Sequence, residues 1–223
     1  MQRPQLQLLW FIACSLRVAC CAQTNGAAFY EAAWSHFKDR DYAPALTNFT
    51  RVLELNPWNP DAFCGRGMSK WWLHNYRGAI ADYDKAIVLD PTCGGYYCNR
   101  GQARFSLKMV PEALADYDRA IELDPRNAQA YYNRGTLMAV SLTNYARAVA
   151  DLTKALDLHS DPYEKDIFFW RGKARLELKE YAGAVADFSK ALESNQDSDW
   201  SYRSSASTNR DIALRLLRES KKK

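Results

Sequence analysis

The chain repeats itself about every 34 residues, and this repetition constrains its fold more than any other feature. The glycine series is Gly67, Gly101, Gly135 and Gly172. The alanine series is Ala45, Ala79, Ala113, Ala148 and Ala184, and prolines recur at Pro57, Pro91 and Pro125. A fixed period of this length is typical of proteins in which each unit is one supersecondary element that buries its apolar face against its neighbours.

The repetition divides residues 26–198 into five units, 26–59, 60–93, 94–127, 128–164 and 165–198. The second half of the units recurs almost unchanged, as AIADYDKAIVLDP, ALADYDRAIELDP and AVADFSKALES. Apolar residues three and four apart predict a helix with one buried face. Asn-Pro at 56–57 and Asp-Pro at 90–91 and 124–125 end these helices, because proline cannot continue them. Each unit therefore predicts two helices.

This pattern resembles the tetratricopeptide-repeat (TPR) family. Small residues recur on the first helix, at Ala33, Gly67, Gly101, Gly135 and Gly172. On the second helix, the alanine series and a second set (Val52, Ala86, Ala120, Ala155, Ala191) flank the large residues Phe49, Tyr83, Tyr117, Leu152 and Phe188. Small residues let the two helices approach closely, and large ones fill the seam. The resemblance implies an all-α fold, a right-handed α–α superhelix of antiparallel helix pairs.

The remainder, residues 199–223, predicts a linker, a capping helix and a basic tail ending in Lys221, Lys222 and Lys223. The last unit of a stack needs a lid over its apolar face. We expect a helix at residues 208–217 to supply it, with Thr208 or Asn209 as N-cap. Trp200 and Tyr202 predict one further anchoring contact.

Residues 1–22 predict a secretory signal peptide, with Arg3, an apolar run at 6–16 and a small-residue exit at Ala22. The run is shorter than the roughly 20 residues that span a bilayer. Such a signal implies an exported, luminal or periplasmic protein; without it, the protein is expected in the cytoplasm. Three alternatives remain: an uncleaved anchor or transit peptide, an extra capping helix, and a bacterial lipobox at Cys20 or Cys21.

Three of the six cysteines lie in this N-terminal segment, and Cys64, Cys93 and Cys98 lie in the repeats. Three is an odd number for a secreted protein. Cys93 and Cys98 could form a disulfide; the alternative is three unpaired thiols packed as small apolar groups. Their spacing does not match a zinc site.

Two charged columns appear together in units two to five. The cations are Arg66, Arg100, Arg134 and Arg171, and the anions are Asp82, Asp116, Asp151 and Asp187. Unit one has Ala32 and Asn48 instead and lacks both charges. We therefore expect each Arg to bury its stem and pair with the Asp of its own hairpin. The alternative is a basic stripe for an acidic ligand.

In the TPR family, the first helices line a concave groove, and the resemblance implies the same here. The predicted partner-binding residues are Tyr30, Trp34, Phe37, Met68, Trp71, Asn99, Gln102, Phe105, Tyr132 and Asn133. The columns continue through Thr136, Ala139, Phe169, Lys173 and Leu176. Apolar and aromatic surfaces of this kind mark interaction sites, and Asn99 and Asn133 could bind a peptide backbone. Alternatively, neighbouring helices or the N-terminal segment cover some of the aromatics.

The sequence offers no catalytic motif. It has three histidines, and neither a Gly-rich phosphate loop nor a His-Glu-x-x-His helix. We predict no enzyme activity, no cofactor and no metal. The net charge of +4 includes the three terminal lysines, so the repeats lack the charge of a nucleic-acid-binding domain.

The predicted function is that of a protein-interaction scaffold or adaptor that holds a peptide or helix in the groove. TPR domains that clamp the C-terminal carboxylate of heat-shock chaperones use cations that this chain lacks. The aligned positions hold Cys64 and Met68, then Asn99, then Gln129 and Asn133, so we expect no such clamp. The alternatives are an RNA-associated repeat protein that uses the Arg column and Lys tail, and a non-catalytic subunit of an enzyme complex.

Overall fold

The computed structural model describes residues 26–158, 164–193 and 200–222, all of them in helices or in the turns and bends between them, with no strand. The chain divides into two compact units, residues 1–92 and 93–223. These are called unit 1 and unit 2, in numerals, whereas the five sequence repeats keep their names in words, unit one to unit five. The predicted signal peptide lies outside the described residues. Within the described ranges, no helix is long and apolar enough to cross a membrane.

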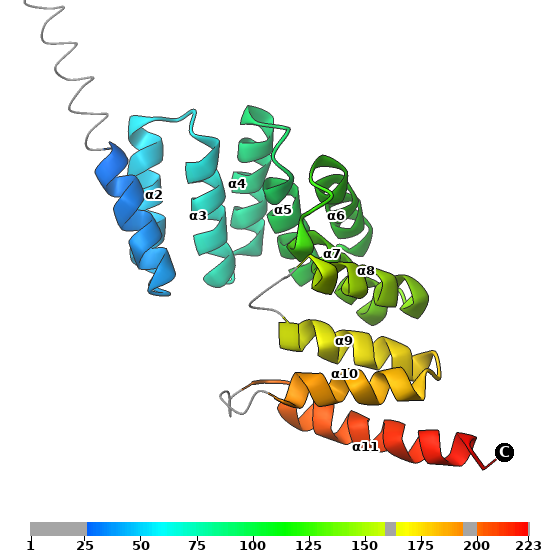
Figure 1. Ribbon diagram of the computed structural model, residues 1–223. Helices are drawn as coiled ribbons and strands as arrows, with labels where there is room; N and C mark the ends of the chain where they lie inside the picture. Colours follow the sequence, from blue (N-terminus) through cyan, green and yellow to red (C-terminus); the bar gives the residue numbers. More distant parts are fainter. Residues whose placement is uncertain (1–25, 159–163, 194–199, 223) are drawn as a thin grey trace, which may run out of the picture. The chain divides into compact units, whose positions relative to one another are not determined.

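Unit 1 contains a helix at residues 26–38, then α2 (Tyr42–Leu55), α3 (Pro60–Trp72) and α4 (Tyr76–Leu89) (Figure 1). Helix α3 packs against both α2 and α4. The helices end where the sequence predicts, since α2 and α4 stop one residue before Asn56 and Asp90, each followed by proline.

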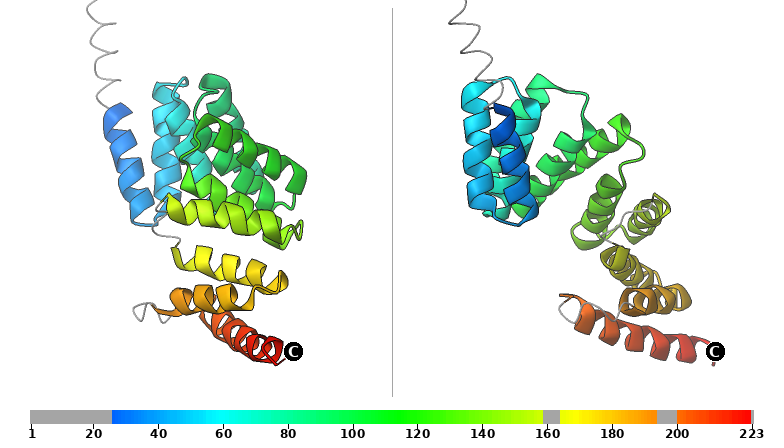
Figure 2. Two further views of the ribbon diagram at one scale, coloured as in Figure 1. Left: turned by 45° about the vertical axis from the view of Figure 1, so that its right-hand side comes forward. Right: turned by 60° about the vertical axis from the view of Figure 1, so that its left-hand side comes forward.

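Unit 2 contains three hairpins and a final helix. The hairpins are α5 (Gly94–Ser106) with α6 (Val110–Leu123), α7 (Ala128–Val140) with α8 (Tyr145–Asp157), and α9 (Glu164–Glu177) with α10 (Tyr181–Glu193). Helix α11 (Arg203–Ser220) follows. Each hairpin packs on the next, α11 packs on α10, and the first helices α5, α7 and α9 also touch in sequence (Figure 2). The prediction of an all-α fold of antiparallel helix pairs is confirmed.

Asparagine side chains start four of these helices. Asn59, Asn75, Asn127 and Asn144 each accept a hydrogen bond from the backbone N–H three residues later, at 2.9, 3.0, 2.9 and 3.3 Å. This bond satisfies an amide that has no partner within the helix. The starts of α3, α4, α7 and α8 are therefore set by local sequence signals.

The glycine column sets how closely the two helices of a hairpin approach. A Cβ built on Gly67 would lie 2.8 Å from the Tyr83 ring, and one on Gly101 would lie 2.7 Å from the Tyr117 ring. Both tyrosines are buried. The large second-helix residues thus fill the space that a side chain at the glycine would occupy, and alanine at these positions would force the ring or the helix to shift.

The last helix starts earlier than predicted. Helix α11 begins at Arg203 rather than Thr208, its N-cap is Tyr202, and no side chain caps it. The predicted N-cap was wrong because the Thr208 hydroxyl donates to Ser204 O, one turn back inside the helix. Ala206 follows Gly172 by 34 residues and is buried, as is Ala213. Helix α11 therefore stands where the first helix of a sixth unit would begin.

Candidate functional site

The predicted groove residues of the helix at 26–38 pack against one another. The Trp34 ring lies edge-on to Phe37 at 5.6 Å and to buried Phe49 at 5.2 Å, and Tyr30 is edge-on to Trp34 at 6.3 Å. Edge-to-face pairs of this kind stabilise an aromatic cluster. Tyr30, Trp34 and Phe37 are half-buried, so they form part of the first hairpin's core and also reach its surface.

A chain of ring contacts joins this cluster to α3. Phe37 touches Tyr42, whose ring stacks on Trp72 at 5.0 Å, and Trp72 meets Trp71 edge-on at 5.0 Å. Met68 and Trp71 are half-buried. The Trp71 indole nitrogen is buried and has no hydrogen-bond partner among the described residues. The structure thus joins four of the five predicted residues of unit 1, Tyr30, Trp34, Phe37 and Trp71, through one chain of ring contacts.

In unit 2, Asn99, Gln102, Phe105 and Tyr132 are half-buried on α5 and α7. Asn133 does not fit its predicted role, because its side chain is only 7% exposed. Its Nδ2 donates to Cys98 Sγ at 3.5 Å, and its Oδ1 accepts from Gln129 Nε2 at 3.2 Å. This amide thus joins α7 to α5 and is largely buried.

The three cysteines of the repeats are free thiols, so the Cys93–Cys98 disulfide is not formed. Cys64 and Cys98 are buried and Cys93 is half-buried. Buried free cysteines behave as small apolar groups. Across the described ranges, no group of His, Cys, Asp or Glu side chains could hold a metal ion.

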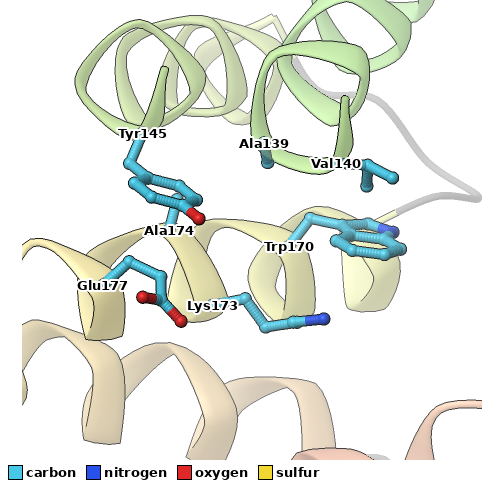
Figure 3. Close-up of a pocket in the computed structure, with 7 residues that line it drawn as sticks. All are labelled: Ala139, Val140, Tyr145, Trp170, Lys173, Ala174 and Glu177. Carbon is cyan, nitrogen blue, oxygen red and sulfur yellow. The ribbon is translucent and has the colours of Figure 1, made fainter. Parts of the chain in front are cut away.

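Unit 2 also contains a pocket between the end of α7, the start of α8 and α9, with a volume of about 230 Å³. Its lining residues are Ala139, Val140, Tyr145, Trp170, Lys173, Ala174 and Glu177. Figure 3 shows Tyr145 reaching from α8 toward α9, whose Trp170, Lys173 and Glu177 line the facing wall. The pocket therefore combines an aromatic face, a cation, a carboxylate and a phenol.

Among the described residues, no ion pair neutralises the charges of this pocket. The Lys173 ammonium lies 4.9 Å from the Trp170 ring centroid and 5.7 Å from that of Phe169, a cation–π arrangement. Within the described part of the chain, Lys173 and Glu177 have no ion-pair partner, and the Tyr145 hydroxyl has no hydrogen bond. These three groups are available to a bound molecule.

Sequence reasoning placed Ala139 and Lys173 in groove columns but missed Trp170, Glu177 and Tyr145. Trp170 occupies the position that Asn99 and Asn133 hold in earlier units, and Glu177 corresponds to Val140. The position of Asn99 and Asn133, when continued into the fifth repeat, leads to Trp170 and is the signal that indicates it. Tyr145 stands at the turn between the two helices of its unit, like Tyr42, Tyr76, Val110 and Tyr181, and this turn position did not predict a place in the pocket.

The Arg and Asp columns meet within each hairpin. The shortest distances are 2.7 Å for Arg66–Asp82, 2.6 Å for Arg100–Asp116, 2.8 Å for Arg134–Asp151 and 2.7 Å for Arg171–Asp187. Each guanidinium also lies over an aromatic ring three residues earlier: Phe63, Tyr97, Tyr131 and Phe168. Bidentate pairing and ring contact both favour Arg over Lys here.

Most of these aspartates bind a second cation that the sequence analysis missed. It lies one turn after the Arg, at Lys70, Arg104 and Arg175, each 2.7 Å from its carboxylate. In unit four this position is the buried Met138, and Arg134 instead reaches Asp118 at 2.6 Å. Burial opposes the charge of Arg134, but its hydrogen bonds to Asp151 and Asp118 outweigh it and raise the pKa of Arg134.

The start of α11 is anchored on α9. Trp200 Nε1 donates to Asp166 at 2.6 Å, and the Tyr202 ring stacks on Phe169 at 4.6 Å. Burial, and to a smaller extent the charge of Asp166, raises the pKa of Tyr202. Phe169, which the groove columns had placed at the surface, is only 1% exposed beneath these rings. The predicted anchoring contact thus covers one of the predicted groove positions.

Comparisons with known proteins match this repeat geometry. A family model described as tetratricopeptide repeat matches residues 30–92 and 137–199, and one described as TPR repeat matches residues 101–139. A comparison with curated protein sequences gave no significant match.

Solved structures with the same fold include several TPR proteins. TTC0263, a TPR protein of Thermus thermophilus, is 22% identical, with 82% of this chain and 98% of that chain covered and a TM-score of 0.68. MamA from residue 41 onward, of Desulfovibrio magneticus RS-1, is 19% identical, with 79% and 98% covered and a TM-score of 0.63. The first TPR of Spaghetti (RPAP3), bound to the HSP90 peptide SRMEEVD, is 28% identical, with 52% and 92% covered and a TM-score of 0.50.

Proposed function

The chain belongs to the tetratricopeptide-repeat family, and we propose that it is a non-enzymatic scaffold or adaptor that binds a segment of another protein along its first helices. Relatives of this fold are consistent with such a role, since one of them was solved with a bound peptide. A stack of short hairpins presents a long surface built from many side chains, which suits an extended or helical ligand.

One observation carries this proposal. Most charged groups on the first helices are satisfied by the protein itself, as in the pairs Arg100–Asp116 and Arg171–Asp187. Lys173 and Glu177, in contrast, line a pocket beside Trp170 with no ion-pair partner among the described residues. Aromatic side chains are enriched among the anchors of protein interfaces, and the unpaired charges beside Trp170 could orient a bound segment.

The same contrast argues against the RNA-binding alternative. The column arginines would have to contact phosphates, but each is held by an aspartate of its own hairpin and lies over an aromatic ring. A role as a non-catalytic subunit of an enzyme complex would use the same first-helix surface. We also propose that no carboxylate clamp operates, since Cys64, Gln129 and Asn133 stand where cations are needed.

Site-specific photo-cross-linking tests the proposal. The amino acid p-benzoylphenylalanine would replace Gln102 or Val140 on first helices, and Arg119 or Lys154 on the exposed side of second helices as controls. Adducts from an extract of the source cells should be several-fold more abundant at Gln102 and Val140. Circular dichroism would verify that all four variants fold. Equal adduct yields at both pairs of positions would contradict binding along the first helices.

A further inference from the structure

The pocket between α7, α8 and α9 presents two opposite charges in a fixed order. Lys173 and Glu177 are four residues apart on α9, so they are about 6 Å apart along the helix axis. Opposite charges at this spacing often pair with each other. Here they do not, because Lys173 lies over the rings of Trp170 and Phe169 instead. The pocket therefore has a cationic end and an anionic end.

The size of the pocket limits what can enter it. Its volume of about 230 Å³ is below that of sites for drug-sized ligands and suits one or two side chains rather than a whole helix. Ala139 and Ala174 form small apolar walls, and Trp170 adds an aromatic wall. The Tyr145 hydroxyl can donate or accept a hydrogen bond.

The rise along α9 from Lys173 to Glu177 is close to the spacing of alternate residues in an extended peptide. In an extended strand, residues i and i+2 project to the same side and are about 6.6 Å apart. This spacing is close to the axial separation of Lys173 and Glu177. An acidic and a basic side chain two residues apart could therefore meet Lys173 and Glu177 together, without distortion of the peptide.

From this complementarity we propose that the pocket recognises an extended segment of a partner protein with an acidic and a basic side chain at positions i and i+2. The acid pairs with Lys173, and the base pairs with Glu177. This proposal rests on the proposed function and adds the chemistry of the bound segment. Neither ion pair is deeply buried, so each contributes specificity more than affinity.

Four blocked peptides test the proposal against the full chain. The first is acetyl-Gly-Ser-Glu-Ala-Lys-Ser-Gly-amide, and the others replace Glu, Lys or both with Gln. Titration to about 10 mM would be followed by NMR at the Trp170 indole N–H, assigned with Trp170→Phe. We expect the doubly charged peptide to bind about threefold more tightly than either singly charged one, as exposed ion pairs allow. This advantage should shrink in 0.5 M salt.

Matched variants of the protein locate the effect. Lys173→Gln or Glu177→Gln should abolish the advantage of the doubly charged peptide. Lys154→Gln and Asp157→Asn, which remove exposed charges three residues apart on α8, should preserve it. The proposal is overturned if no peptide binds, if the neutral peptide binds as tightly as the doubly charged one, or if the Glu peptide alone suffices and Glu177→Gln has no effect.

Failure of this proposal and failure of the proposed function give different results. If the peptides fail while cross-links still favour Gln102 on α5 over Arg119 on α6, only the chemistry assigned to the pocket is wrong. If cross-links form equally at first and second helices, the first helices are not the binding surface, and both proposals fail.

Discussion

At the scale of single residues, the aspartate column organises each hairpin from units two to five. Asp116 has a side chain only 4% exposed and binds Arg100 at 2.6 Å and Arg104 at 2.7 Å. Removing its charge would leave two partly buried guanidinium groups without an anion. The cost of such a loss is larger than the net benefit of forming the pair, because the remaining charges stay desolvated.

We therefore expect Asp116→Asn to lower the free energy of unfolding by about 2–3 kcal/mol, somewhat below the value for fully buried pairs. Glu122→Gln on the same helix is the control, since Glu122 pairs with Arg119 at the exposed surface and should change stability by less than about 0.5 kcal/mol. Urea denaturation followed by circular dichroism would measure both. Similar midpoints for the two variants would show that the Asp116 network is not stabilising.

The sequence predicted the pairing partners of Arg100 and Asp116 but not the second cation, Arg104. The Arg100–Asp116 pair could be predicted because both charges are absent together from the first repeat. The position of Arg104 holds Lys70, Met138 and Arg175 in other repeats, and this mixed column does not follow the aspartate column. Asn133 was misjudged for a related reason. A period shows which side of a helix a residue occupies, but the contact between Asn133 and Cys98 depends on how deeply α7 packs against α5.

At the scale of helices, prolines and asparagine caps determine most of the helix ends, whereas the start of α11 depends on packing between helices. Asn-Pro and Asp-Pro end α2 and α4 as expected, and asparagine caps begin α3 and α7. The start of α11 could not be predicted from caps, because Tyr202 is fixed by stacking on Phe169. The pocket was missed because Tyr145 and Trp170 meet only when α8 and α9 are in place.

The junctions between hairpins differ in one testable contact. Arg134 Nη1 lies 2.6 Å from Asp118 of the preceding hairpin. At the next junction, Arg171 Nη1 lies 3.1 Å from the Thr153 hydroxyl instead. Asp118 and Thr153 occupy the same repeat position, since each follows its buried Tyr117 or Leu152 by one residue. The first junction therefore has an ion pair where the second has a neutral hydrogen bond.

We expect Thr153→Asp to raise the free energy of unfolding by about 0.5–1 kcal/mol, because a charge-assisted bond to Arg171 replaces the neutral one. The reverse change, Asp118→Thr, should lower it by a similar amount. Urea midpoints would measure both, and 1 M salt should reduce the gain. A double-mutant cycle with Arg171→Gln isolates the pair; a gain that persists without Arg171 would rule out this explanation.

At the scale of the whole molecule, the predicted cleavage site after Ala22 lies before the first described helix. The first described helix starts at residue 26, so cleavage after Ala22 would leave Gln23, Thr24 and Asn25 before it. Such a cut would also remove Cys14, Cys20 and Cys21, so that only Cys64, Cys93 and Cys98 would remain. The proposal of a secretory signal and the folded repeats are therefore compatible.

We expect the protein isolated from its own cells to begin at Gln23, as N-terminal sequencing and intact mass would show. Alkylation under native conditions should then modify Cys93 first, because Cys64 and Cys98 are buried and react only when the repeats open. A chain that keeps Met1 would instead favour an anchor or a capping helix at residues 1–22. Recovery of Cys93 and Cys98 as a disulfide would contradict the free thiols of the folded protein, whatever its N-terminus.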